Sequence, residues 1–289
     1  MNEITAKRLA VVRMLFEKGK ALSYEGEPIN GLCLLPFHDS VEMFLKLCAD
    51  EKGLQVQRNA TFLSYFDLMP EMQDKAQMDS LNSRRVSLKH HGQLPSKLDV
   101  EVSRVNVTDF FDHNTPTFYG CRLDEVSLDV LIEFQEVRKY LALFHQFVKE
   151  GKYGEAQAQC QIAFQALLAS YHRKYDRELS LHDGPGHGVE WLQKPNLEEK
   201  TDNYLERLRD AIVSINEAIS IMNLGINYYS FKSFLAKGPY VSRWPDEPED
   251  KYDYWVGDLS RYSEETANEC YQFVIGTALK LQESNVFLQ

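Results

Sequence analysis

Apolar residues recur three and four positions apart in nearly every segment of this 289-residue chain, and this spacing restricts the folds it can adopt. Such spacing places side chains on one face of an α-helix, whereas a half-buried strand alternates every second residue. Runs of β-branched residues bounded by tight turns, which predict strands, are scarce. The pattern therefore predicts an all-α protein, long enough to bury a substantial core without disulfides or metals.

The first 120 residues are expected to hold four helices. We expect these helices at about residues 4–22, 37–48, 72–91 and 97–112. Asp39 or Ser40 is expected near the start of the second helix. Gly92 suits the end of the third helix because glycine tolerates a left-handed backbone, and Pro95 lies just beyond it. An irregular stretch over residues 114–120 would follow the fourth helix.

The second half of the chain also shows helical patterns. Helices are predicted over residues 128–150 and 153–175, with a turn at Gly151, and a last helix is predicted from a cap at Ser263 to about residue 282. Loops are predicted over residues 181–196 and 238–259, and the second is rich in aromatic residues. Eight apolar residues between these loops have heptad spacing: Leu205, Leu208, Ile212, Ile215, Ile219, Met222, Ile226 and Tyr229. We interpret them as one face of a long core helix, the alternative being a seam through which subunits pair.

The chain is divided by these patterns into a helical domain over residues 1–120 and a second helical domain over 121–289. The segment Phe16–Lys20 is echoed by Phe147–Lys152, and each precedes a helix with an aromatic and aliphatic face. A chance similarity between two amphipathic hairpins is the preferred explanation. A degenerate repeat of the first helical pair is the alternative.

Charge and composition exclude several classes of function. The chain has 32 Lys and Arg against 43 Asp and Glu, a net charge of −11, so a general basic coat for nucleic acid is absent. Contact with a polyanion would therefore need a local patch. Neither a Walker loop nor a dinucleotide-binding glycine fingerprint is present.

The cysteines and the hydrophobic runs indicate the cellular compartment in which the protein is expected. The five cysteines are widely spaced and form no C-x-x-C pair, which is typical of reduced, packed cysteines in an intracellular protein. Residues 1–20 lack the unbroken apolar stretch of a signal peptide, and no run approaches the length of a membrane span. We therefore expect a cytoplasmic protein that does not enter the membrane.

One segment departs from the acidic average. No acid occurs between Asp79 and Asp99, and six residues there are basic or imidazole-bearing: Arg84, Arg85, Lys89, His90, His91 and Lys97. An imidazole that titrates near neutrality beside a guanidinium is what RNA cleavage without a metal requires. The imidazole moves protons, and the guanidinium neutralises charge that builds on the phosphorus centre.

These residues resemble a known family. Arg85, four intervening residues and His90 fit the R-x4-6-H motif of the HEPN superfamily, and the segment Phe37–Leu47 resembles the second helix of that family. The resemblance covers about residues 1–120. It implies a helical bundle, a homodimer whose two motifs form one composite site, and a metal-independent endoribonuclease of an antiviral or toxin system that needs no cofactor.

The resemblance also implies roles for individual residues. Arg85 would stabilise the scissile phosphate, His90 would act as general acid or base, and Glu42 would orient them. An ideal helix places Arg84 and His91 about 20° apart but Arg85 and His90 about 140° apart, so Arg84 and His91 remain alternatives. The nearby cations that would contact RNA are Lys89 and Lys97.

The rival hypothesis is a non-catalytic helical module that binds a protein partner, such as an antitoxin, or a nucleotide. Its binding surface would be the face formed by the heptad residues, or the acidic aromatic loop at 238–259, which contains Trp244 and Trp255. The loop from His182 to His187 offers two imidazoles and a carboxylate, but it lacks the fixed ligand spacing of a metal site. We therefore predict no metal.

Overall fold

The computed structural model describes residues 2–57, 60–175, 199–242 and 251–283, and most of these lie in helices. The predicted all-α class is confirmed, with one two-stranded antiparallel sheet as the exception in the described residues. The chain forms two compact units, which we call the N-terminal unit (residues 1–131) and the C-terminal unit (132–289). The division therefore follows Leu131 rather than residue 120.

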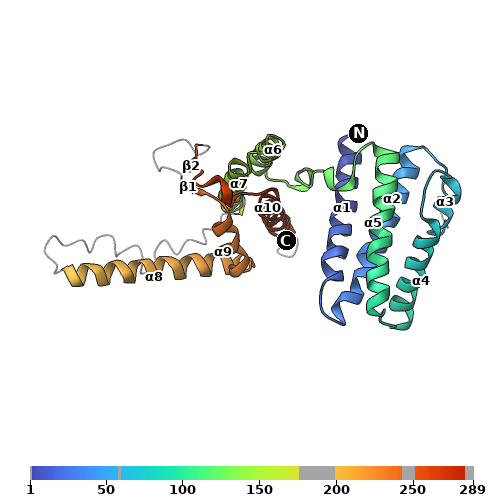
Figure 1. Ribbon diagram of the computed structural model, residues 1–289, viewed down its shortest axis with the longest axis horizontal. Coiled ribbons are helices and arrows are strands. Elements are labelled where there is room, and N and C mark those ends of the chain that lie inside the picture. The colour runs from blue at the N-terminus through green and yellow to red at the C-terminus, as the bar shows by residue number, and fades with distance from the viewer. Residues whose placement is uncertain (1, 58–59, 176–198, 243–250, 284–289) are drawn as a thin grey trace. The chain divides into compact units, whose positions relative to one another are not determined.

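The N-terminal unit is a helical bundle. Its elements are α1 (Glu3–Ser23), η1 (Ile29–Cys33), α2 (Leu34–Glu51), α3 (Ser64–Leu68), α4 (Lys75–His91), α5 (Lys97–Tyr119), η2 (Leu123–Glu125) and η3 (Asp129–Leu131). The four long helices α1, α2, α4 and α5 lie side by side (Figure 1). The two short 3-10 turns η2 and η3 pack back on α1, which is why they belong to this unit.

Aromatic side chains fill the core between these helices. The ring of Phe44 on α2 meets Phe110 and Phe111 of α5 edge to face, with centroids 5.7 and 5.5 Å apart. A Cβ atom on Gly19 of α1 would lie 2.6 Å from the ring of Phe37, so only glycine allows α1 and α2 this close an approach. The packing fixes α2 in the centre of the unit, where it contacts α1, α4 and α5.

The start of α2 differs from the prediction. The helix begins at Leu34, five residues before Asp39, so neither Asp39 nor Ser40 is its cap. The preceding turn η1 leads directly into the helix, and Pro36 is tolerated in the first helical turn because the amide there needs no partner. The earlier start places His38 and Asp39 inside the helix.

The end of α5 also differs. The irregular stretch predicted over residues 114–120 is wrong, because the helix continues through Pro116 to Tyr119. Asn114 is fully buried, and its side chain donates to the carbonyl of Phe110 at 2.8 Å and accepts from the amide of Gln73 at 2.9 Å. This tertiary anchoring outweighs the hydrogen bond that Pro116 removes.

The C-terminal unit consists of helices and one short hairpin. Its elements are α6 (Gln135–Lys149), α7 (Tyr153–Tyr175), α8 (Glu199–Asn223), α9 (Tyr228–Lys237), β1 (Tyr240–Ser242), β2 (Asp253–Trp255), η5 (Leu259–Arg261) and α10 (Glu264–Glu283). The core includes Phe164 of α7, whose ring lies 5.5 Å from both Phe234 and Phe273. Gly151 has the left-handed backbone expected of the predicted turn, and the Ser263 hydroxyl caps α10 as predicted.

Two predictions for the C-terminal unit need correction or lie outside the described residues. Helix α6 begins at Gln135 rather than at 128, although the apolar residues before it are buried. The interpretation of the heptad residues as a core face of α8 is wrong, because Leu208, Ile215 and Met222 are exposed. The predicted loop at 181–196, with its two histidines, and Trp244 lie outside the described residues.

None of the described helices combines the length and the apolar character that crossing a membrane requires.

Candidate functional site

The predicted motif lies on α4, and its basic residues gather at the end of this helix. The helix ends at Gly92, as predicted, with a φ of 65° that glycine adopts without strain, and the Gly92 amide donates to the Leu88 carbonyl at 3.2 Å. The last turn carries Lys89, His90 and His91, all exposed. Positive charge is favourable there because the helix end carries partial negative charge.

Arg84 forms an ion pair with Asp99 of the following helix, α5. Its Nε donates to Oδ1 of Asp99 at 2.9 Å, and Asp99 also accepts from the hydroxyl of Ser96 at 2.6 Å in the capping box of α5. The guanidinium of Arg84 therefore joins α4 to the start of α5. Arg84 Nη1 is buried without a partner, as is Arg85 Nε, but only Arg84 has a carboxylate partner among the described residues, and the choice of register stays a prediction.

Arg85 points from α4 toward α2. Its Nε is buried and has no hydrogen-bond partner among the described residues. Its charge acts on two α2 side chains, because it lowers the pKa of both His38 and Glu42. The charge of Arg85 therefore reaches Glu42, and the roles predicted for the two residues stay predictions.

His38 is the site residue that sequence reasoning did not assign. The side chain is only 4% exposed, its ring stacks on Phe62 with centroids 4.5 Å apart, and neither ring nitrogen has a hydrogen-bond partner in the described part of the chain. Burial lowers its pKa, and the charge of Arg85 lowers it further. Its spacing of four residues from Glu42 on one helix could have indicated the pair.

Glu42 lies between cations of α2 and α4. Its carboxylate pairs with Lys46 at 2.6 Å and lies 3.9 Å from Nδ1 of His38. Partial burial acts to raise the pKa of Glu42, but the hydrogen bond and charge of Lys46, with the charge of Arg85, outweigh burial and lower it. Glu42 is therefore a carboxylate at neutral pH, held by the ammonium group of Lys46.

The two predicted catalytic histidines lie apart from this cluster. Neither His90 nor His91 makes a hydrogen bond, ion pair or ring contact with any described residue, and both face solvent. Lys97, at the start of α5, is also exposed. One copy of the chain thus presents Arg85 toward α2 and the imidazoles toward solvent, and it does not bring them into contact.

A set of possible metal ligands overlaps the cluster. One ligand atom each from His38, Asp39 and Glu42 lies within 4.8 Å of the others. The side chains of Lys46 and Arg85 place two positive charges beside these carboxylates. Because these charges oppose the entry of a cation, we assign no metal to the cluster.

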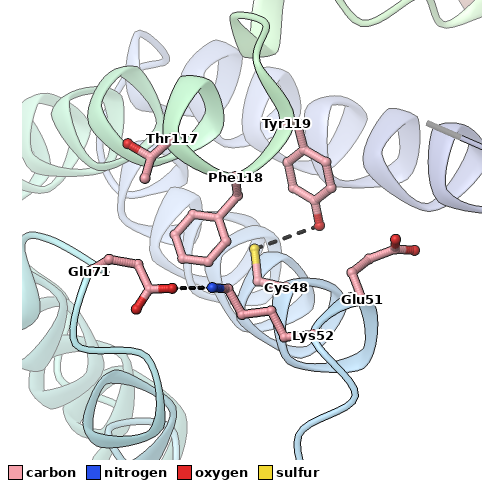
Figure 2. Close-up of a pocket in the computed structure, with 7 residues that line it drawn as sticks. All are labelled: Cys48, Glu51, Lys52, Glu71, Thr117, Phe118 and Tyr119. Carbon is pink, nitrogen blue, oxygen red and sulfur yellow. Dashed lines mark hydrogen bonds and ion pairs between the residues drawn. The ribbon is translucent and has the colours of Figure 1, made fainter.

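A pocket of about 320 Å³ lies elsewhere in the N-terminal unit, and Figure 2 shows its lining. The Cys48 thiol donates to the Tyr119 hydroxyl at 3.6 Å, and Lys52 pairs with Glu71 across the opening. Burial raises the pKa of the Cys48 thiol to about 12, so it is protonated and a poor nucleophile. The pocket therefore offers no activated group.

No family model matches the chain, and no curated protein or solved structure matches it. The function must therefore be argued from the cluster on α2 and α4 and from the basic end of α4.

Proposed function

We propose that the N-terminal unit is a metal-independent endoribonuclease of the HEPN type, in which Arg85 binds the scissile phosphate and His90 transfers protons. The observation that carries the proposal is the state of Arg85. Its guanidinium forms no ion pair with a described residue, has a buried Nε without a partner, and is near enough to Glu42 for its charge to lower the pKa of that carboxyl. Such a guanidinium is available to an anionic group.

The chemistry requires a base and an acid but no added reagent. The 2′-oxygen attacks the neighbouring phosphorus while its proton passes to a neutral imidazole. The bond from phosphorus to the 5′-oxygen then breaks, and the leaving oxygen takes a proton from an imidazolium. The products are a 2′,3′-cyclic phosphate and a 5′-hydroxyl. His90 and His91 are exposed at the end of α4, where RNA can reach them, and Arg85 would neutralise the charge on the phosphate.

The site would require two copies of the chain. Arg85 and His90 are about 140° apart around an ideal helix, so a single copy directs them to different sides. In a two-fold dimer, the imidazole of one copy can approach the guanidinium of its partner. The exposed ammonium groups of Lys89 and Lys97 would hold flanking phosphates at the same end of the bundle.

The test is RNA cleavage in the presence of a chelator. The purified chain should produce fragments with 2′,3′-cyclic phosphate ends, and Arg85→Ala or His90→Ala should lower the rate by about 10²–10⁴. Arg122→Ala and His113→Ala are matched controls, since both residues are exposed and lie outside α4. RNA that stays intact with the wild-type chain under all conditions would contradict the proposal.

The resemblance also supports a role in defence or as a toxin, and growth provides its test. Expression of the wild-type chain should slow growth of the host cell, whereas expression of the double variant Arg85→Ala, His90→Ala should not. Equal growth arrest by the wild-type chain and the double variant would show that toxicity does not depend on the proposed site.

A protein-binding module is the second candidate, and the hairpin of the C-terminal unit favours it. Tyr240 and Trp255 face each other across β1 and β2, and their exposed fractions are 77% and 76%. Exposed aromatic pairs of this kind are enriched at protein interfaces. Trp255→Ala should abolish partner capture while leaving RNA cleavage unchanged.

A further inference from the structure

Helix α8 carries an apolar stripe that faces solvent. We call Tyr204, Leu205, Leu208, Ile212, Ile215, Ile219 and Met222 the α8 stripe. On an ideal helix these seven positions fall within a sector about 100° wide. Their exposed fractions reach 67% at Tyr204, 57% at Ile215 and 60% at Met222. A continuous apolar surface of this kind on a folded chain marks an interaction site.

The contacts of α8 within its own unit use another face. Helix α8 packs on α9 near its C-terminal end, where Ile221 and Leu224 are buried (Figure 1). Ile221 is about 180° from Ile212 around the helix, so burial against α9 leaves the stripe uncovered. The ion pair between Lys232 of α9 and Glu217 of α8, at 3.3 Å, also lies outside the stripe.

We propose that the α8 stripe pairs with the same stripe of a second copy of the chain. The alternating spacing of three and four residues is the period of a two-helix seam, and a copy of α8 has the same period by identity. The inference rests on the stripe alone, and it holds whether or not the chain cleaves RNA.

The exposed area is sufficient for a pair. The five exposed members of the stripe present roughly 450 Å² in one copy, so two copies would remove about 900 Å² of apolar surface from water. A specific interface needs about 1,000 Å² in total, and the residues that border the stripe supply the remainder.

The borders of the stripe also favour a copy of α8 over a strongly charged partner. Besides Tyr204, which belongs to the stripe, five positions flank its heptads, and four of them are small or uncharged: Ala211, Asn216, Ala218 and Asn223. Arg209 is the one charged side chain at these positions. Two copies therefore meet without opposing rows of like charge, whereas a charged partner would find few counter-charges.

Two residues of α8 provide a matched test. Ile215 and Val213 are both β-branched, and both are 57% exposed, but Val213 lies about 160° away from Ile215 and outside the stripe. Lysine at position 215 would place a charge in the seam, whereas lysine at position 213 would remain in solvent. The variants are Ile215→Lys and Val213→Lys in the full chain.

Sedimentation equilibrium of the full chain measures the outcome. The wild-type chain and Val213→Lys should both sediment as a dimer of about 67 kDa, twice the 33.5 kDa of one copy. Ile215→Lys should dissociate at least about tenfold more readily, with unchanged helical circular dichroism as evidence of folding. A monomeric wild-type chain at about 100 μM, or equal dissociation constants for wild type and Ile215→Lys, would overturn the proposal.

The same samples keep this inference separate from the proposed function. Arg85→Ala should remain dimeric while losing RNA cleavage. A dimer that requires Ile215 but does not cleave RNA would support the pairing of α8 and contradict the nuclease.

Discussion

Arg84 Nε donates to Oδ1 of Asp99 at 2.9 Å, and this ion pair joins the last turns of α4 to the first turn of α5. The same carboxylate accepts from the hydroxyl and the amide of Ser96. One aspartate thus closes the cap of α5 and holds an arginine of the predicted motif. Arg84 and Arg85, adjacent in the sequence, therefore have different environments.

Asp99→Ala should destabilise the N-terminal unit without abolishing RNA cleavage. The substitution removes half of the capping box, which costs about 1 kcal/mol, and the ion pair adds little because both partners are partly exposed. Thermal unfolding of Asp99→Ala, with Asp109→Ala on the exposed side of the same helix as control, measures the loss. An equal effect of the two substitutions would contradict the role of the cap.

His38 should make the stability of the chain depend on mildly acidic pH. Its pKa in the folded chain is below the usual 6.5, mainly because burial disfavours the imidazolium. The unfolded chain therefore binds more protons, and stability is lost as the pH falls below about 6.5 toward the folded pKa. Urea unfolding at several pH values should show this slope, and His38→Gln should reduce it. An unchanged slope would show that His38 is not the titrating group.

His113 should contribute to the pH dependence of stability with the sign opposite to that of His38. Its Nδ1 lies 2.8 Å from the carboxylate of Asp74, and this hydrogen bond and charge raise the pKa of the imidazole. The stabilisation is complete below the unfolded pKa and is lost as the pH rises through the folded pKa. A nuclear magnetic resonance titration should place the pKa of His113 above 6.5 and that of His38 below it. Asp74→Asn should lower the pKa of His113 alone.

Thiol reactivity should distinguish Cys121 from the other cysteines. Cys33, Cys48, Cys160 and Cys270 are buried, and burial raises the pKa of Cys33, Cys48 and Cys270 to about 12. Burial also raises the pKa of the Cys121 thiol, but this side chain is partly exposed and a reagent can reach it. A disulfide reagent at pH 8 should therefore modify one thiol quickly in the native chain and five after unfolding. A thiol that still reacts quickly in native Cys121→Ser would contradict this assignment.

The helical class and most of the helix positions could be predicted from the sequence, because periodic apolar residues and local caps act over a few residues. Gly92 and Ser263 end and begin helices where the sequence places them. The start of α2 and the end of α5 could not be predicted, because they depend on distant contacts. Asn114, for example, is held by the backbone of Gln73, 41 residues away.

Sequence alone determined that this chain is a helical protein with one basic, acid-free segment at a helix end, since those properties depend on residue type and spacing. Only the tertiary structure decided what each residue of that segment meets. It paired Arg84 with Asp99, directed Arg85 toward Glu42 and the buried His38, and left the imidazoles of His90 and His91 in solvent. The reason is that the rotation of α4 against its neighbours, which no local pattern encodes, sets which side chains face a partner helix and which face water.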